Sequence, residues 1–174
     1  NYRNYAYETF EFCNGVNIIS GFNAQGKTNA AEAIFYLCTG YSPRAGKEKQ
    51  VIKYNSDSAS ISANAFSAFG SVSARIEFDK TDGKKIFVND MPLSKTGELL
   101  GNINAVMFNP QQLKLVQESP EDRRRFMDIA LSQMSRKYFY ALLKYRKILQ
   151  QRNGLLKEKD VELIKDTLPV WDEQ

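Results

Sequence analysis

Three hydrophobic patterns follow one another along the first half of the chain. Residues 16–20 are rich in β-branched side chains and predict a short strand after a turn at Asn14-Gly15. Apolar residues at helical spacing then run from Ala30 to Cys38. Alternating apolar and polar residues come next and predict a run of antiparallel strands, at 59–66, 71–78 and 85–88.

The second half of the chain carries different patterns. Residues 103–108 are almost continuously apolar, which is typical of a short buried strand. Ser119-Pro120-Glu121-Asp122 is a helix-start signal and predicts a helix to about Ser132. Ser135 predicts the N-cap of a longer helix that reaches about Arg152. The expected inner stripe of that helix is formed by Phe139, Leu142, Leu143, Arg146 and Leu149. The expected outer, basic stripe is formed by Arg136, Tyr140, Lys144, Lys147 and Gln151.

A glycine-rich segment joins the first predicted strand to the first predicted helix. It reads Gly21-Phe22-Asn23-Ala24-Gln25-Gly26-Lys27-Thr28 and matches the phosphate-loop pattern G-x-x-x-x-G-K-[ST]. Its backbone N–H groups can form an anion nest, because the two glycines tolerate positive φ angles. Lys27 brings a charge toward the β- and γ-phosphates, and the Thr28 hydroxyl is a ligand for Mg²⁺. Since a helix N-terminus also favours anions, the order of strand, loop and helix predicts an ATP–Mg²⁺ site on all eight residues.

The charge distribution indicates a candidate for a second functional surface. The formal net charge is +4, which permits a polyanionic partner. Between residues 123 and 152 there are nine Lys or Arg residues against one acid, Asp128. A solvated helix face explains many such runs. The imbalance also fits a surface that faces DNA, with Arg136, Lys144 and Lys147 as its expected contacts.

Composition excludes several other classes of function. The chain has no His, which removes His-based acid–base chemistry and His metal ligands. Cys13 and Cys38 show no metal or redox spacing, so we expect two reduced thiols in a cytosolic protein. No apolar run is long enough for a membrane span, and the first residues are not a signal peptide. Because the chain does not begin with Met, we expect it to start part-way into a strand.

The patterns together predict an α/β fold of two parts, a P-loop ATPase lobe at 1–118 and the start of a helical lobe at 119–174. Two other classes of function stay open. A small-molecule or nucleotide kinase would alternate strands and helices without a break, and the antiparallel run at 59–88 argues against it. A basic DNA-binding module with an incidental loop would have no affinity for Mg-nucleotide, so a nucleotide-binding assay separates it from an ATPase.

Several segments together resemble the RecF family, and they occur in order over essentially the whole chain. They are Asn1-Tyr2-Arg3-Asn4-Tyr5, the phosphate loop with Asn29, Phe108-Asn109-Pro110, 119–126 (Ser-Pro-Glu-Asp-Arg-Arg-Arg-Phe), Gln151-Arg152-Asn153 and 170–174 (Val-Trp-Asp-Glu-Gln). The phosphate loop alone indicates only a P-loop ATPase. The Arg-Arg-Arg-Phe and Trp-Asp-Glu-Gln segments make the resemblance specific.

The resemblance implies an SMC-like, ABC-type ATPase head with a mixed sheet plus antiparallel strands. Such proteins bind ATP, Mg²⁺ and DNA, single-stranded or gapped, and dimerise around nucleotide. They act with RecO and RecR to help load RecA at gaps during replication, recombination and repair. Another SMC-like head is the alternative within this class, although the helix after Ser135 lacks the sustained heptads of a long coiled coil.

The resemblance also implies roles for single residues. Arg3 matches an arginine that SMC-like heads place near the phosphates. Gln111 or Gln112 lies where ABC-type heads carry a glutamine that reaches Mg²⁺ and the attacking water, although this family more often has Pro-Glu-Asp-Leu where this chain has Pro-Gln-Gln-Leu. We identify neither a Walker B carboxylate nor a signature loop, so the catalytic residues stay unknown. We therefore expect the chain to be the N-terminal portion of a protein about twice as long, with weak DNA-linked ATPase activity in the whole protein only.

Overall fold

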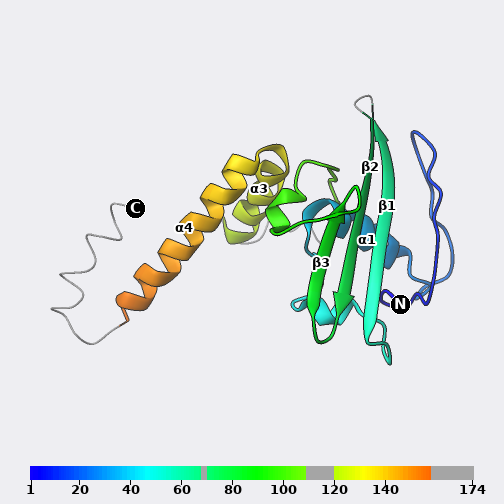
Figure 1. Cartoon of the computed structure of the whole chain (residues 1–174), viewed down its shortest axis with the longest axis horizontal. Helices are drawn as coiled ribbons and strands as arrows, with labels where there is room; N and C mark the ends of the chain where they lie inside the picture. Colours follow the sequence, from blue (N-terminus) through cyan, green and yellow to red (C-terminus); the bar gives the residue numbers. More distant parts are fainter. Residues whose placement is uncertain (68–69, 109–119, 158–174) are drawn as a thin grey trace.

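The computed structural model describes residues 1–67, 70–108 and 120–157. Within them the chain forms one sheet with a helix against it and a helical arm to one side (Figure 1). The elements in chain order are α1 (Lys27–Thr39), η1 (Glu48–Val51), β1 (Ser58–Ser67), β2 (Gly70–Asp79), β3 (Gly83–Val88), β4 (Met91–Pro92), η2 (Thr96–Glu98), α3 (Pro120–Met134) and α4 (Arg136–Leu155).

The sheet is an antiparallel meander of order β1-β2-β3-β4. Ile61, Ile76 and Ile86 lie opposite one another in neighbouring strands. The two-residue turn between β3 and β4 has φ values of 50° at Asn89 and 61° at Asp90. Positive φ at both central residues matches the right-handed twist of a hairpin, and Asn and Asp tolerate it well. The predicted antiparallel run is confirmed.

The core lies between this sheet and α1. The ring of Tyr36 on α1 meets Phe78 of β2 edge-on, with centroids 5.1 Å apart. Buried side chains from the N-terminal segment, α1, η1, the strands and the residues that follow η1 and η2 complete a single cluster of Tyr2, Tyr36, Leu37, Val51, Ile52, Ala59, Ile61, Ala74, Ile76, Phe78, Ile86 and Leu99. The predicted helix at 30–38 is confirmed, and its buried side fixes the direction in which the preceding loop leaves the core.

Two predicted strands are wrong. Residues 16–20 and 103–108 are not strands in the structure. Val16 and Ile18 are 85% and 86% exposed, so the apolar side chains of the first segment lie in solvent. A β-branched sequence forms a strand only where a neighbour completes its backbone hydrogen bonds and covers one face. Among the described residues, no strand pairs with either segment.

The second of these segments is instead paired by a side chain. The Gln133 amide of α3 donates to the Ala105 carbonyl at 3.0 Å and accepts from the Ala105 N–H at 2.9 Å. Gln133 is buried, so this pairing gives hydrogen-bond partners to polar groups that burial has removed from water. It also fixes α3 against the backbone that follows η2.

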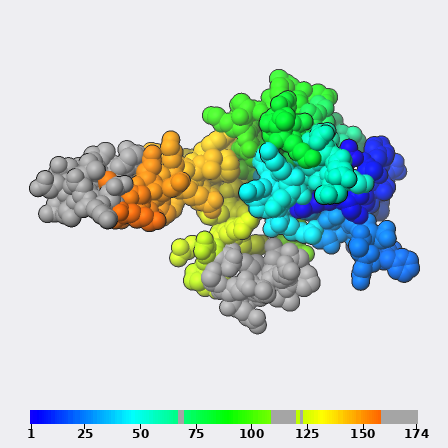
Figure 2. All heavy atoms as spheres, turned by 90° about the horizontal axis from the view of Figure 1, so that it is seen from below, coloured from blue at the N-terminus to red at the C-terminus, as the bar shows by residue number. Residues whose placement is uncertain are grey.

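The helical arm begins as the sequence predicts. Ser135 is the N-cap of α4 and accepts from the Tyr138 N–H at 3.2 Å. Asp128 of α3 accepts from the Tyr138 hydroxyl and pairs with Arg146, which holds the two helices together. Ser119, the expected cap of α3, lies outside the described residues. Figure 2 shows α4 extending away from the lobe as a narrow arm.

The arm is only partly covered along its predicted inner stripe. Phe139 and Leu142 are half-buried, whereas Leu143 and Leu149 are exposed. No helix in the described part of the chain has the length and apolar character needed to cross a bilayer.

Candidate functional site: a phosphate loop and a buried ionic cluster

The phosphate-loop sequence forms a curled segment directly before α1. Gly21, Ala24 and Gly26 have φ values of 147°, 66° and 104°. Gly26 is the N-cap of α1 in the left-handed conformation, and its carbonyl accepts from the N–H groups of Asn29 and Ala30. No side chain caps this helix end, and its first turn carries no acid. The geometry therefore presents the positive end of a 13-residue helix behind a loop of backbone N–H groups.

Lys27 lies across the mouth of this loop. Its ammonium donates to the Gly21 carbonyl at 2.6 Å and to the Phe22 carbonyl at 2.7 Å. The loop itself is exposed apart from Gly26, which is buried, and Lys27, which is half-buried. A cation held over a nest of N–H groups is the arrangement that binds a polyphosphate. Thr28 is exposed beside it, so its hydroxyl is accessible to a metal.

The N-terminal segment covers the base of the loop. A Cβ on Gly26 would lie 2.6 Å from the Tyr5 ring and 2.8 Å from the Asn4 side-chain oxygen. Any larger residue at Gly26 would have to displace these side chains, and it would also be strained at φ 104°. Glycine is required here by both conformation and space.

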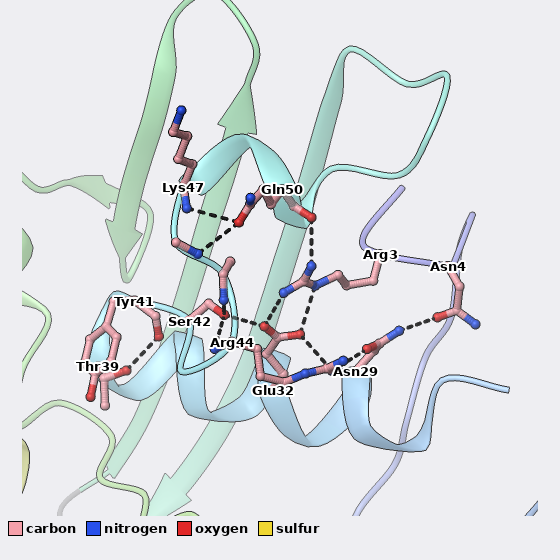
Figure 3. A network of polar contacts seen from close by, with 12 residues as sticks. Arg3, Asn4, Asn29, Glu32, Thr39, Tyr41, Ser42, Arg44, Lys47 and Gln50 are labelled. Atoms are coloured by element: carbon pink, nitrogen blue, oxygen red, sulfur yellow. Dashed lines mark hydrogen bonds and ion pairs between the residues drawn. The ribbon is translucent and has the colours of Figure 1, made fainter. Parts of the chain in front are cut away.

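A buried ionic cluster lies one turn along α1 (Figure 3). Glu32 is 0% exposed and accepts two hydrogen bonds from Arg3, from Nε at 3.0 Å and from Nη2 at 2.6 Å. The Ser42 hydroxyl also donates to this carboxylate, and the Arg44 guanidinium lies 3.6 Å from it. Burial of a carboxylate is tolerated when charged partners and hydrogen bonds surround it in this way.

Arg3 thus lies near the loop but is held by the cluster. Its Nη1 donates to the Gln50 carbonyl at 2.8 Å, and the bond to Glu32 raises the pKa of the guanidinium. Its own backbone is left-handed, with φ 54°. The expected role of Arg3 toward phosphate stays a prediction. Gln111 and Gln112 lie outside the described residues.

Sequence reasoning missed Glu32, Ser42 and Arg44. One signal was available for the first of them, because Glu32 is a lone acid on the side of the helix that also carries Ala33 and Tyr36. Nothing in the local sequence of the 41–50 loop distinguishes Ser42 or Arg44 from ordinary loop residues.

The three predicted DNA contacts do not share one environment. Lys144 and Lys147 are exposed on α4. Arg136 is also exposed, but its Nε donates to the Leu100 carbonyl at 3.0 Å and so helps to attach the arm to the lobe. Only the two lysines form a surface with no such structural task among the contacts described.

Fold and loop together define a P-loop nucleotide-binding head, and comparisons with known proteins agree. A family profile described as an AAA domain matches residues 1–168. The chain therefore belongs to the AAA domain family.

The particular resemblance is to the DNA replication and repair protein RecF. RecF of Acetivibrio thermocellus is 42% identical over 173 residues, covering 99% of this chain and 47% of that protein. RecF of Alkaliphilus oremlandii is 43% identical over 174 residues, covering 100% of this chain and 47% of that protein. The chain thus spans about half the length of the curated relatives it matches, and the RecF resemblance is confirmed.

Solved structures confirm the fold class. The recombination mediator protein RecF with ATP, in the RecFOR pathway, superposes with a TM-score of 0.89 at 36% identity, covering 99% of this chain and 47% of that one. An SMC ATPase structure superposes with a TM-score of 0.59 at 19% identity, covering 74% of this chain and 93% of that one, and supports the fold alone.

Proposed function

We propose that the intact protein is an ATP-binding DNA repair and recombination protein that binds DNA in an ATP-dependent manner. In this proposal it assists RecA loading at single-strand gaps in the cytoplasm, together with RecO and RecR. The observation that carries the proposal is the curled loop at 21–28, with Lys27 across it and α1 behind it. RecF relatives matched over the whole chain supply the DNA repair context.

ATP would be held mainly through its phosphates. The N–H groups of the loop and the α1 N-terminus would surround the β-phosphate, and Lys27 would exchange its two carbonyl partners for phosphate oxygens. Arg3 belongs to the same proposed site as a second cation near the phosphates. The nine residues proposed for nucleotide contact are therefore Arg3 and the eight residues of 21–28.

Mg²⁺ fits this site as a partner of the nucleotide. Among the described residues there is no group of three or more His, Cys, Asp or Glu side chains that could hold a metal alone. Mg²⁺ keeps several waters and commonly takes its remaining ligands from one or two protein oxygens and the substrate phosphates. The exposed Thr28 hydroxyl is the protein oxygen that we assign to it.

Replacing Lys27 with Ala tests the site. A charge-assisted contact to phosphate contributes about 1.5–3 kcal/mol, so we expect ATP affinity to fall at least about tenfold. Calorimetry with Mg-ATP measures the change, and Lys95→Ala, an exposed lysine before η2, is the matched control. Unchanged Mg-ATP affinity in Lys27→Ala would contradict the assignment of the 21–28 loop as the ATP site.

We further propose weak, DNA-linked ATPase activity in an ATP-dependent homodimer of the full-length protein. Hydrolysis requires a group that organises water and a partner group that completes the site, and the loop supplies neither. Gln111 and Gln112 are the proposed candidates for the first role. The 174-residue chain alone should show negligible turnover, and vigorous magnesium-dependent hydrolysis by it would reveal an unrecognised catalytic acid.

DNA binding is proposed for the basic face of α4, with Arg136, Lys144 and Lys147 as the contacts. This face belongs to the helical part, which we place at 119–174 beside an ATPase lobe at 1–118. Contacts of this type go to phosphates, so they tolerate any sequence and weaken steeply with salt.

Reversing Lys144 and Lys147 to Glu in the full-length protein tests this surface. We expect weaker DNA binding and a shallower dependence of log affinity on log salt, with ATP affinity unchanged because the loop is a separate site. Reversal of Lys80, in the turn between β2 and β3, and of Lys85, in β3, is the control. DNA affinity and salt dependence that survive the double reversal would instead favour a solvated face or a protein partner such as RecR.

A further inference from the structure

Glu32 connects three segments that are distant in the sequence. Arg3 comes from the N-terminal segment, Ser42 and Arg44 come from the loop after α1, and the carboxylate itself lies on α1. Figure 3 shows Arg3 and Ser42 reaching the Glu32 carboxylate from opposite directions. The side chain of Glu32 is fully buried, whereas that of Arg44 is 47% exposed, so the cluster extends from the core to the surface.

Burying a carboxylate beside a sheet carries a large desolvation cost. Buried ion pairs are often no more stabilising than apolar residues of the same volume. The value of such a group lies in the orientation that it imposes on its partners. Here the partners are two arginines, one on the N-terminal segment and one on the loop after α1. The first segment contacts the phosphate loop through Asn4, and the second is linked to it through Asn29.

A chain of hydrogen bonds leads from this cluster to the loop. Arg44 Nη1 donates to the Asn29 side-chain oxygen at 2.9 Å, and the Asn29 amide donates to the Asn4 side-chain oxygen at 2.8 Å. The Asn4 amide then donates to the Ala24 carbonyl at 3.4 Å. Each asparagine accepts through its oxygen and donates through its nitrogen, so the order of the bonds is chemically consistent.

Strained backbone lies at Ala24, where this chain of hydrogen bonds ends, and at Arg3, on the other side of Glu32. Arg3 and Ala24 are non-glycine residues with φ values of 54° and 66°. Such conformations are disfavoured and persist only where the surroundings impose them. Hydrogen bonds to Glu32 hold the Arg3 side chain in place. Ala24 lies within the curled loop whose N–H groups are expected to face a phosphate.

We propose that Glu32 is a positioning residue for the phosphate loop, acting through Arg3 on one side and through Arg44, Asn29 and Asn4 on the other. The inference rests on ATP binding at the loop as proposed above. Glu32 touches no nucleotide in this account. It holds the N-terminal segment in the position where Asn4 donates to the Ala24 carbonyl and the Tyr5 ring lies against Gly26.

The test is a double-mutant cycle on Mg-ATP affinity in the full-length protein. Glu32→Gln keeps the shape of the side chain but removes the charge that orients both arginines, and we expect a loss of about fivefold, within the range of network couplings. Asn4→Ala removes the far end of the chain at an exposed position, and we expect a loss of about threefold. The double variant should be no weaker than Glu32→Gln alone, because both changes interrupt one relay.

Two matched variants serve as controls. Glu77→Gln removes another glutamate that pairs with an arginine at 2.6 Å, on the outer part of β2. Asn64→Ala removes another exposed asparagine, on β1. Both should leave ATP affinity unchanged.

The thermal unfolding midpoint without nucleotide separates positioning from folding. A lower midpoint in Glu32→Gln with unchanged ATP affinity of the folded protein would overturn the proposal. Normal ATP affinity in Asn4→Ala would also overturn it. So would a double variant whose loss of ATP affinity equals the product of the two single losses. If Glu32→Gln does not fold, Asn4→Ala and Asn29→Ala form the deciding cycle, with non-additive losses supporting the relay and additive losses opposing it.

Lys27→Ala is measured alongside. Normal affinity in Lys27→Ala would reject ATP binding at the loop itself, whereas loss there with normal Asn4→Ala affinity rejects the relay alone.

Discussion

The sheet lobe and the α3–α4 arm are stabilised in opposite ways. In the lobe, Val51 and Ile76 are fully buried, and the residues around them come from the N-terminal segment, α1, η1 and the strands. In the arm, α4 has no buried residue, and Leu143 is 47% exposed. The lobe depends on burial between distant segments, whereas the arm depends on local capping and a few polar contacts.

This difference indicates where each part is vulnerable. A change in the lobe leaves a cavity that many segments share, so its cost should be high. A change on α4 leaves its neighbours in contact with water, so its cost should be small unless it affects a cap or a docking contact. Those docking contacts are few, and they include Gln133 with Ala105, Arg136 with Leu100, and Phe139 with Gly97.

The largest expected effect compares one apolar truncation in each region. Ile76→Ala should lower the free energy of unfolding by about 2–5 kcal/mol, because it empties a fully buried position between β1 and β3. Leu143→Ala should change it by less than about 0.5 kcal/mol. Urea unfolding of both variants measures the difference, and equal losses would contradict the contrast between lobe and arm.

The second effect concerns the joint between the two regions. Gly97 of η2 is buried, and a Cβ there would overlap the Phe139 ring of α4. Gly97→Ala should therefore cost about 1–3 kcal/mol by overpacking, and adding Phe139→Ala should relieve part of that loss.

Gly154→Ala is the matched control for this joint. A Cβ at Gly154 meets nothing within 4 Å, and the residue lies in α4, so this change should stabilise by up to about 1 kcal/mol. Thermal unfolding of all three variants measures these differences. A Gly97→Ala protein as stable as the parent would show that Phe139 moves aside freely.

A third effect tests whether the arm depends on local signals. Ser135→Ala removes the side chain that accepts from the Tyr138 N–H, and should cost about 0.5–2 kcal/mol. Ser60→Ala, at an exposed position of β1, should cost less than about 0.5 kcal/mol. Loss of helical circular dichroism at lower temperature in Ser135→Ala alone is the expected result, and identical melting of both variants would oppose it.

The smallest effect is a pH dependence in the turn between β2 and β3. Hydrogen bonds from the Thr81 hydroxyl and N–H, and from the Asp82 N–H, lower the pKa of Asp79 to about 2 from an ordinary value of 3.8. Because the folded pKa is depressed, the stabilisation is present above about pH 4 and is lost as the pH falls toward 2.

Thr81→Val tests the cause of that shift. It removes the hydroxyl donor but keeps the backbone donors, so the pKa of Asp79 should rise part of the way toward 3.8. Titration followed by NMR on the Asp79 carboxyl measures it. An unchanged pKa in Thr81→Val would assign the shift to the backbone N–H groups alone.

Predictions from the sequence succeeded where the signal was local. Alternation over 59–66 and 71–78 specifies which face of each strand is buried, and the short gap between the two segments favours antiparallel pairing, so β1 and β2 follow. The Ser135 cap and the loop pattern at 21–28 are local for the same reason, since a few backbone angles and one side chain define them.

The same reasoning failed for 16–20 and 103–108. Both segments have the composition of buried strands, but composition describes only a preference for a sheet neighbour. In the structure the side chains of Val16 and Ile18 are exposed, and no described strand pairs with their segment. The Ala105 backbone is hydrogen-bonded to the Gln133 side chain and not to a strand. The identity of a partner depends on distant residues, which periodicity does not contain.

The sequence by itself therefore determined the meander, the helices, the capped start of α4 and the phosphate loop with Lys27. Only the tertiary structure decided that Arg3 is directed to Glu32, that Ser42 and Arg44 join it, and that Asn4 and Tyr5 lie against the loop. The physical reason is the range of the interactions. Backbone angles and caps are set within a few residues, whereas a buried charge is satisfied by whichever distant groups the folded core brings within hydrogen-bond distance.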